Sequence, residues 1–356
     1  MNTPGPKNPL SNTRTVVYSF VILITVISIP HLTANHLSLT VIDTSSVSYF
    51  FYAFNSLSIV YLIVPFFVVE LIRYVWIKKF SKDLVLDSIT NVITVVAFQA
   101  INYILGWLFV LKLYVLAWDA RFFQELPLNW VTIVSCILLA DFLYYWEHRL
   151  MHRLGAGWAT HTVHHSSPHF NMSVAYRFGP LDGEYPLFFS IPAVMFGFNP
   201  YLLLAAELFV QTYQTILHTE VIGKLPAPIE SVMNTPSHHR VHHGSNRQYW
   251  DMNYAGILII WDRMFGTFVP EEEEVVYGIS EPLESVNPIK VFFHGLTRFY
   301  DKLSQIEGYR NKLLAFVKPP DWRPLEQAAE SEPQVRSARR RVRMFSANRN
   351  EEAEKE

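Results

Sequence analysis

Eleven of the 14 histidines lie between His148 and His243, and their spacing suits metal binding. His148 and His152 form an i, i+4 pair, and sets with i, i+3, i+4 spacing begin at His161 and at His239. On a helix the members of each set lie on one face about one turn apart, so each set is close enough to share a metal ion. Neutral imidazole suits zinc and iron, and several rings must converge on each ion. Together with His218 these sets give nine expected ligands, enough for two metals: His148, His152, His161, His164, His165, His218, His239, His242 and His243.

Two more histidines of this region are not expected to be ligands. His238 points about 100° away from His239 on a helix, so we expect it to support a ligand or to line a pocket. His169 follows Pro168, which breaks a helix. The remaining histidines, His31, His36 and His294, lie outside the clusters and are expected to be incidental.

Polar neighbours are expected around the ligands because a metal-bound imidazole normally gives its other N–H to an acceptor. Asp141 lies two helical turns before His148, on the same face, and is the first candidate. The full set of expected supporting residues is Asp141, His238, Asn171, Glu220 and Asp251. Ordinary ion pairing is an equally good interpretation of each acidic residue.

The elements that must hold these residues are apolar helices. Hydrophobic residues make up 50% of the chain, and Lys+Arg 29 nearly balance Asp+Glu 31, which gives no support to nucleic-acid binding. Cys136 is the single cysteine, which excludes disulfide frameworks and thiolate clusters. Four windows are apolar enough to cross a ~30 Å hydrocarbon layer: Thr15–Pro30, Ser45–Val69, Ser88–Leu111 and Leu126–Tyr145.

The sidedness of the chain follows from its charges. Lys7 and Arg14 precede the first span and no Lys or Arg follows it until after the second, which predicts a cytoplasmic N-terminus. The stretch Leu187–Leu217 is too long for one crossing and too short for two, so we expect a re-entrant hairpin. Such a hairpin keeps His218 on the cytoplasmic face with the other histidines, in the endoplasmic reticulum of a eukaryote or the cytoplasmic membrane of a bacterium.

The predicted fold class is therefore all-α. We expect a polytopic membrane helical bundle with about four spans, a re-entrant hairpin and a helical histidine-box domain on the cytoplasmic face. The expected divisions are an N-terminal transmembrane region at 1–125, a di-metal oxygenase domain at 126–296, a peripheral helix at 297–318 and a disordered charged tail at 319–356.

The motifs HRLMH, HTVHH and HRVHH, with His218 before the last, resemble the histidine boxes of the membrane fatty acid hydroxylase and sterol desaturase superfamily. The similarity covers about residues 128–296. Within it, DFLYYWEHRLMH, WATHTVHHSSPHFN and NTPSHHRVHHGSN resemble the alkylglycerol monooxygenase branch, whereas GPLDG at 179–183 is similar to an element of the sterol branch.

The resemblance implies a non-haem di-iron centre with two irons per chain, O₂ as oxidant and a lipid substrate taken from the bilayer. The alkylglycerol branch further implies a reduced tetrahydropterin, and the chain has no haem-binding or dinucleotide-binding motif, so a separate electron donor is expected. Cleavage of the O-alkyl bond of an ether lipid is the expected activity. The histidines do not distinguish it from sterol desaturation, sterol methyl oxidation or fatty-acyl hydroxylation, and a membrane zinc transporter or store is the alternative from another class. The oligomeric state stays open.

Overall fold

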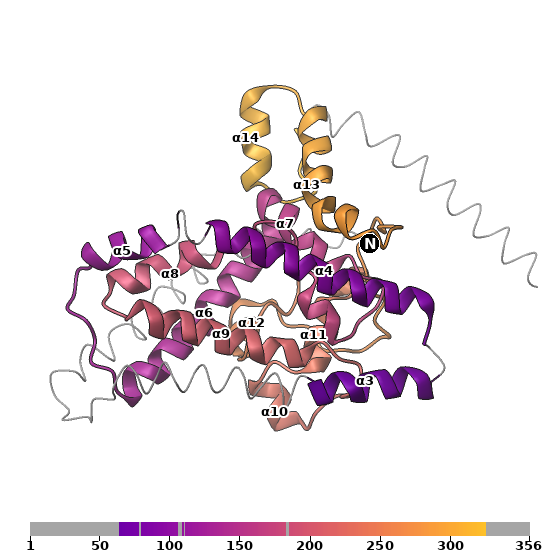
Figure 1. The fold of residues 1–356 in the computed structure, drawn as a ribbon, viewed down its shortest axis with the longest axis horizontal. Helices are drawn as coiled ribbons and strands as arrows, with labels where there is room; N and C mark the ends of the chain where they lie inside the picture. Colours follow the sequence, from indigo (N-terminus) through magenta and orange to yellow (C-terminus); the bar gives the residue numbers. More distant parts are fainter. Residues whose placement is uncertain (1–63, 78–79, 106–108, 110, 183–184, 325–356) are drawn as a thin grey trace, which may run out of the picture.

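The computed structural model describes residues 64–77, 80–105, 109, 111–182 and 185–324, which form helices joined by loops (Figure 1). These residues contain no β-strand, only isolated bridges between Met233 and Leu258 and between Gly244 and Tyr277. The all-α class is confirmed for this part of the chain. The first predicted span, most of the second and the tail from residue 325 lie outside the described residues.

The α-helices are α3 (Val64–Trp76), α4 (Lys82–Leu105), α5 (Leu111–Asp119), α6 (Trp130–Arg153), α7 (Gly155–His165), α8 (Tyr185–Met195), α9 (Pro200–Leu217), α10 (Ala227–Val232), α11 (Pro236–His242), α12 (Ile260–Phe265), α13 (Pro288–Gln305) and α14 (Tyr309–Val317). Two short 3₁₀ helices are η4 (Met172–Tyr176) and η5 (Arg247–Tyr249).

Two of the described helices, α4 and α6, are long and apolar enough to cross a membrane, with 24 residues each. They correspond to the third and fourth predicted spans. Asn129 starts α6, because its side chain accepts a hydrogen bond from the Thr132 N–H. The helix then continues eight residues beyond the predicted end at Tyr145, so the candidate span and the first histidine box form one rigid element.

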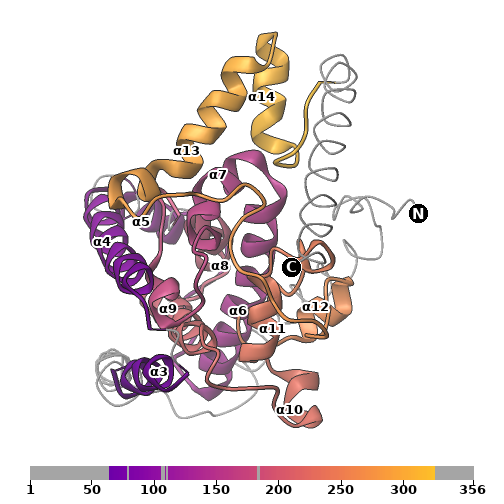
Figure 2. The same cartoon turned by 90° about the vertical axis from the view of Figure 1, so that its right-hand side faces the viewer.

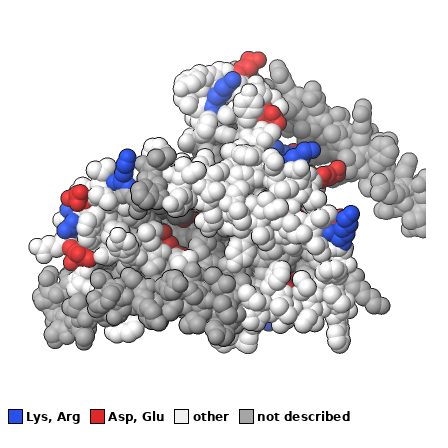
Figure 3. Space-filling model, viewed as in Figure 1, with Lys and Arg blue, Asp and Glu red and all other residues white. Residues whose placement is uncertain are grey.

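The two faces of α4 differ in polarity. Ile89, Val92 and Val96 are at least half exposed, whereas Asp87 and Asn91 are buried against the rest of the chain. Apolar side chains outside and polar ones inside are the arrangement that a lipid environment favours. In Figure 3 the charged side chains of the face viewed lie mostly at its edges and on α13 and α14, and few lie over α4.

The predicted hairpin folds as two helices, α8 and α9, joined by a turn. Asn199 caps α9 by accepting hydrogen bonds from the backbone N–H groups of Tyr201 and Leu202. Both helices pack on α6 around a buried apolar cluster that includes Cys136, Val194 and other side chains less than 4% exposed: Leu139, Leu202, Leu203, Ala206 and Val210. The insertion of this hairpin into the bilayer stays a prediction.

The region after the histidine boxes differs from the single peripheral helix expected at 297–318. Helix α13 begins at Pro288, where Asn287 caps it, and Gly308 with a φ of 80° lies at the start of α14. The predicted boundary at 296/297 therefore falls inside a helix. Figures 1 and 2 show α13 and α14 side by side, standing away from the body next to α7. A Cβ on Gly295 would lie 2.1 Å from the Ala159 carbonyl oxygen, so α13 packs on α7 backbone to backbone.

Candidate metal centre

The nine histidines expected as ligands come together in two buried groups. Within each group the possible ligand atoms all lie within 4.8 Å of one another. We call them the five-histidine group and the four-histidine group. The five-histidine group is His148, His152, His161, His165 and His242, and the four-histidine group is His164, His218, His239 and His243. His169 and His238 belong to neither.

Each His-x-x-His-His box is divided between the two groups, which corrects the expectation that the members of one set share one ion. On α7, His161 and His165 join the five-histidine group, whereas His164 joins the other. An α-helix turns by about 100° per residue, so the side chain at i+4 points only about 40° away from the side chain at i. The side chain at i+3 points about 60° away from the side chain at i, in the opposite direction around the helix. The box at His239 divides in the same way, since His242 alone joins the five-histidine group. Each box therefore bridges both groups.

The Nε2 atoms of each group face one another. Several Nε2 atoms, among them those of His152, His242 and His243, are buried and have no hydrogen-bond partner among the described residues. Two nitrogens roughly 2.1 Å from one ion would lie about 3.0–3.4 Å apart. The Nε2–Nε2 distances are 3.1 Å for His148–His161, 3.3 Å for His161–His165, 3.2 Å for His164–His218 and 3.0 Å for His218–His239.

Backbone carbonyls fix the tautomer of three of these rings. The Nδ1 atoms of His148, His242 and His218 each lie 2.9 Å from a carbonyl oxygen, those of Tyr254, Met252 and Gln214 respectively. A carbonyl can only accept, so each Nδ1 carries the proton and the lone pair is on Nε2. That lone pair faces the centre of the group, where a metal ion would bind.

Burial keeps these rings neutral. Desolvation is the largest cause in every case, and neighbouring histidines lower the pKa further. The pKa is lowered to about 4 for His218 and to about 3 for His242. It is lowered well below the ordinary histidine value for His164, His165, His239 and His243. Neutral imidazoles are the form that coordinates a metal.

Asp182 is a supporting residue that was not predicted. Its Oδ1 lies 3.3 Å from the Nδ1 of His161, and its side chain is buried. Asp182 is the acidic residue of the GPLDG segment, so the sequence did contain the signal. That segment had been interpreted only as a likeness to the sterol branch.

Asp141, the first expected supporting residue, contacts no histidine through the hydrogen bonds of the described residues. Its carboxylate accepts bonds from the N–H groups of Ile257 and Leu258, at 2.6 and 3.1 Å, and from the Trp261 indole at 2.8 Å. A shared helical face did not bring Asp141 into contact with His148, because the two residues are two turns apart along α6. The loop after η5 instead lies within hydrogen-bond distance of Asp141. Asp141 thus holds this loop against α6.

Two other acidic residues were expected near the ligands, and only one lies there. Asp251 Oδ1 is 3.7 Å from His152 Nδ1, and its other oxygen accepts a 2.6 Å bond from Arg153. Glu220 instead pairs with Arg73 at 3.0 Å. Glu220 lies two residues after His218 in sequence, but helix α9 ends at Leu217, so Glu220 does not follow His218 on a helical face.

The remaining two supporting residues have local partners. His238 Nε2 lies 2.8 Å from Glu230 Oε2, and burial lowers the pKa of His238 to about 4. Asn171 caps η4 by accepting a bond from the Ser173 N–H. Neither contacts a member of the two groups by a hydrogen bond.

The loop that supplies two of the carbonyls is itself held in place. Asp262 accepts bonds from the N–H groups of Tyr254 and Ala255, at 2.9 and 2.8 Å. Asp251 and Asn253 have positive φ values of 60° and 56°, which is unusual for residues other than glycine. The fully buried Asn253 side chain stabilises this turn by donating to the His238 carbonyl at 3.1 Å. The ring orientations of His148 and His242 therefore depend on a loop fixed from several sides.

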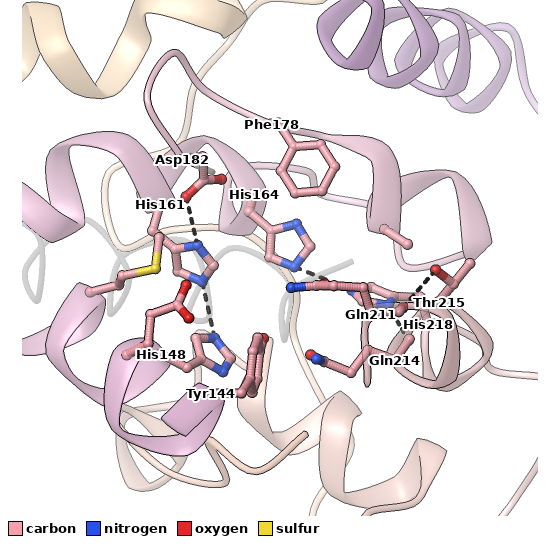
Figure 4. A pocket seen from close by; sticks show the side chains of 13 residues that line it. Tyr144, His148, His161, His164, Phe178, Asp182, Gln211, Gln214, Thr215 and His218 are labelled. Carbon is pink, nitrogen blue, oxygen red and sulfur yellow. Dashed lines mark hydrogen bonds and ion pairs between the residues drawn. The ribbon is translucent and has the colours of Figure 1, made fainter. Parts of the chain in front are cut away.

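A pocket opens onto both groups. His148 and His161 of the five-histidine group and His164 and His218 of the four-histidine group form part of its wall. In Figure 4 the side chains of Tyr144, Gln211 and Gln214 extend into the space between these histidines. The other lining residues are Glu147, Met151, Ala175, Phe178, Asp182 and Thr215. A substrate in this pocket could approach metals in both groups.

The two groups fit transition-metal ions. They supply imidazole nitrogen only, from four or five buried rings each, which suits iron or zinc rather than calcium or magnesium. Orphaned buried nitrogens cost free energy unless a partner satisfies them, and a metal ion in each group would do so.

Comparison with known proteins agrees with this site. Residues 133–267 match the family model described as fatty acid hydroxylase, and this range contains all nine histidines of the two groups. Alkylglycerol monooxygenase of Homo sapiens is 44% identical over 214 residues, which are 60% of this chain and 45% of that protein. The corresponding protein of Caenorhabditis elegans is 36% identical over 252 residues, 67% of this chain and 49% of that protein. The family predicted from the histidine boxes is confirmed for residues 133–267.

A sterol enzyme is also similar. Lathosterol oxidase of Mus musculus is 26% identical over 149 residues, 40% of this chain and 48% of that protein. The chain matches about half the length of these curated relatives. No solved structure matches the chain.

Proposed function

We propose, from the premise that residues 133–267 of this chain belong to the fatty acid hydroxylase family, that the protein is a membrane monooxygenase that cleaves the O-alkyl bond of an alkylglycerol. The observation that carries the proposal is the pair of buried histidine groups that share one pocket. The identity of 36–44% to alkylglycerol monooxygenases supports the ether-lipid substrate.

The family implies iron, and we propose one ion in each group, two per chain. The five-histidine group would hold one and the four-histidine group the other. Bound iron would supply the reduction of O₂ that oxidation of an unreactive alkyl C–H bond requires. The protein's own contribution is to keep the rings neutral, to orient them through the carbonyls of Met252, Tyr254 and Gln214, and to exclude water from the pocket.

The reaction is balanced with one two-electron donor. The carbon next to the ether oxygen gains a hydroxyl from O₂, and the second oxygen atom leaves as water after taking up two electrons and two protons. The hemiacetal that results breaks its C–O bond to give a fatty aldehyde and glycerol. We propose a reduced tetrahydropterin, as a separate molecule, for the two electrons.

The membrane setting is proposed from the apolar helices. The family is membrane-associated, and α4 and α6 are apolar enough to span. We propose four spans in all, with the histidine groups on the cytoplasmic side of the endoplasmic reticulum or of a bacterial membrane. A lipid chain would then reach the pocket from the bilayer along the apolar helices.

The test supplies membranes containing the iron-loaded protein with a 1-O-alkylglycerol and a tetrahydropterin under air, and measures fatty aldehyde. Membranes with the His165→Ala variant are the control, because this ring belongs to the five-histidine group. Aldehyde from the wild type alone supports the proposal. Oxidation of a sterol or acyl lipid without any aldehyde from the ether would contradict the substrate and leave the alternative that the lathosterol oxidase similarity favours.

A further inference from the structure

Glu147 is a buried carboxylate that the metal centre leaves without a partner. It precedes His148 on α6, is 6% exposed and lines the pocket. No described residue forms a hydrogen bond or an ion pair with its side chain, although other buried carboxylates nearby, such as Asp141 and Asp262, accept several bonds. A buried carboxyl group is costly when its oxygens have no hydrogen-bond partner, and hydroxyl groups of a ligand would supply one.

Gln214 faces the same pocket from the opposite element. It lies one turn before His218 on α9 and is 4% exposed. Its backbone oxygen accepts the bond from His218, but its side-chain Nε2 has no hydrogen-bond partner among the described residues. Among the described residues, the pocket therefore presents an acceptor without a hydrogen-bond partner beside one metal group and, beside the other, an amide donor whose side chain also lies near the Tyr144 hydroxyl.

One part of the wall is apolar and leads toward α4. Phe178 stacks on His164, with ring centroids 6.2 Å apart, and on Phe98 of α4, with centroids 4.6 Å apart. Met151 and Ala175 also line the pocket. An alkyl chain along this wall would run from the histidines toward the helix whose outer face is apolar.

We propose that Glu147 and Gln214 form the binding site for the polar end of the substrate. Glu147 accepts hydrogen bonds from substrate hydroxyl groups, and Gln214 donates to the oxygen that joins the alkyl chain to the head group. The site therefore selects lipids that carry free hydroxyls on the head group beyond the ether oxygen. This inference rests on the proposed ether-lipid oxygenase function.

The test compares two substrates in the full-length, iron-loaded protein: a 1-O-alkylglycerol and its 2,3-di-O-methyl derivative, which keeps the chain and the ether oxygen but has no O–H donor. The wild type should prefer the free diol about tenfold in kcat/KM, the worth of one buried hydrogen bond. This comparison needs no variant, so it does not depend on whether a substituted chain folds.

Variants assign the preference to the two residues. Glu147→Gln should raise KM for the diol about tenfold with little change for the methylated lipid, and iron content should stay the same. Gln214→Leu should weaken the binding of both substrates to the same extent, because both keep the ether oxygen. Glu207→Gln is the matched control, since Glu207 is bonded to Ser190 and does not line the pocket.

Three outcomes contradict the inference. Equal turnover of both ethers by the wild type would show that no hydroxyl is recognised. Loss of iron from Glu147→Gln with an unchanged substrate preference would assign Glu147 to charge balance at the metals. Oxidation of neither ether by the wild type would contradict the proposed function itself, and the head-group site with it.

Discussion

The Nδ1 atom of His161 lies 3.3 Å from Oδ1 of Asp182, a residue 21 positions further along the chain. Both side chains are buried, and His161 directs its Nε2 toward His148 and His165. The carboxylate thus orients a ring at the centre of the five-histidine group.

Asp182→Ala should weaken iron binding by about 10- to 100-fold, the usual effect of removing the partner of a metal-bound histidine. Asp182→Asn keeps an oxygen acceptor, so its iron affinity should fall less than that of Asp182→Ala. Iron per chain, measured across a titration with a competing chelator, gives the affinities. Asp301→Ala, at an exposed site on α13, is the control. Unchanged affinity in Asp182→Ala would refute the positioning role.

The division of the histidine boxes predicts which pairs of substitutions affect one metal. His165→Ala with His242→Ala damages two different boxes but only the five-histidine group, so about one iron per chain should remain in the intact group. His164→Ala with His243→Ala should leave about one iron in the other group. Metal analysis by mass spectrometry measures both.

The control for these pairs is His169→Ala, which belongs to neither group and should keep about two irons. If the first pair lost all its iron, the two groups would not be separate sites. If either pair kept two irons, the histidines removed would not be ligands.

The sequence was sufficient to predict the histidines that converge, because i, i+3 and i, i+4 spacing determines which side chains share a helical face. Helical angles separate the i+3 histidine of each box from the other two, but which rings of different boxes join in one group depends on how α7 and α11 face each other across the site. His242 and His243 are neighbours in sequence, yet they enter different groups.

The supporting residues were harder to predict. Three of the Nδ1 partners are backbone carbonyls, which any residue type supplies, so no sequence pattern marks Met252, Tyr254 or Gln214. Asp141 was chosen for its helical face, but a loop from more than 100 residues away in sequence takes its carboxylate. Local periodicity carries no information about such contacts.

Helix boundaries show the same limit. The apolar windows located α4 and α6 because composition alone decides membrane compatibility. Helix α13 runs through the predicted boundary at 296/297 and packs on α7 through Gly295, a contact between segments distant in sequence. The cap at Asn287 followed by Pro288 was the local signal for the true start.

Asp262 should be important for stability because it fixes the loop that orients His148 and His242. In Asp262→Asn the amide N–H₂ would face a backbone donor, so at least one N–H of Tyr254 or Ala255 loses its acceptor. The free energy of unfolding should fall by about 1–3 kcal/mol. Denaturant unfolding of the detergent-solubilised protein, followed by circular dichroism, measures the change.

The matched control is Asp83→Asn, at the exposed start of α4, which should change stability by less than about 0.5 kcal/mol. Equal stability of Asp262→Asn and the wild type would mean that the loop is held by Asn253 and Asp141 without Asp262.

The last prediction concerns the direction of α4 and α6 in the membrane. If the histidine groups face the cytoplasm, the loop between α5 and α6 lies on the opposite side and the segments around η5 and at the end of α13 lie with the histidines. Gln124, Gln248 and Ser304 are exposed positions in these three places. The native Cys136 is fully buried, so the unmodified chain should not react with a thiol reagent and provides the background.

In intact bacterial cells, or in sealed membrane vesicles with the cytoplasmic side inward, a membrane-impermeant maleimide should label Gln124→Cys but not Gln248→Cys or Ser304→Cys. Permeabilisation should make all three reactive, which shows that each site is accessible. Labelling of Gln248→Cys before permeabilisation would place the histidine groups on the outer side, where a cytoplasmic electron donor could not reach them. Labelling of Gln124→Cys only after permeabilisation would mean that α4 and α6 do not cross the bilayer between these positions.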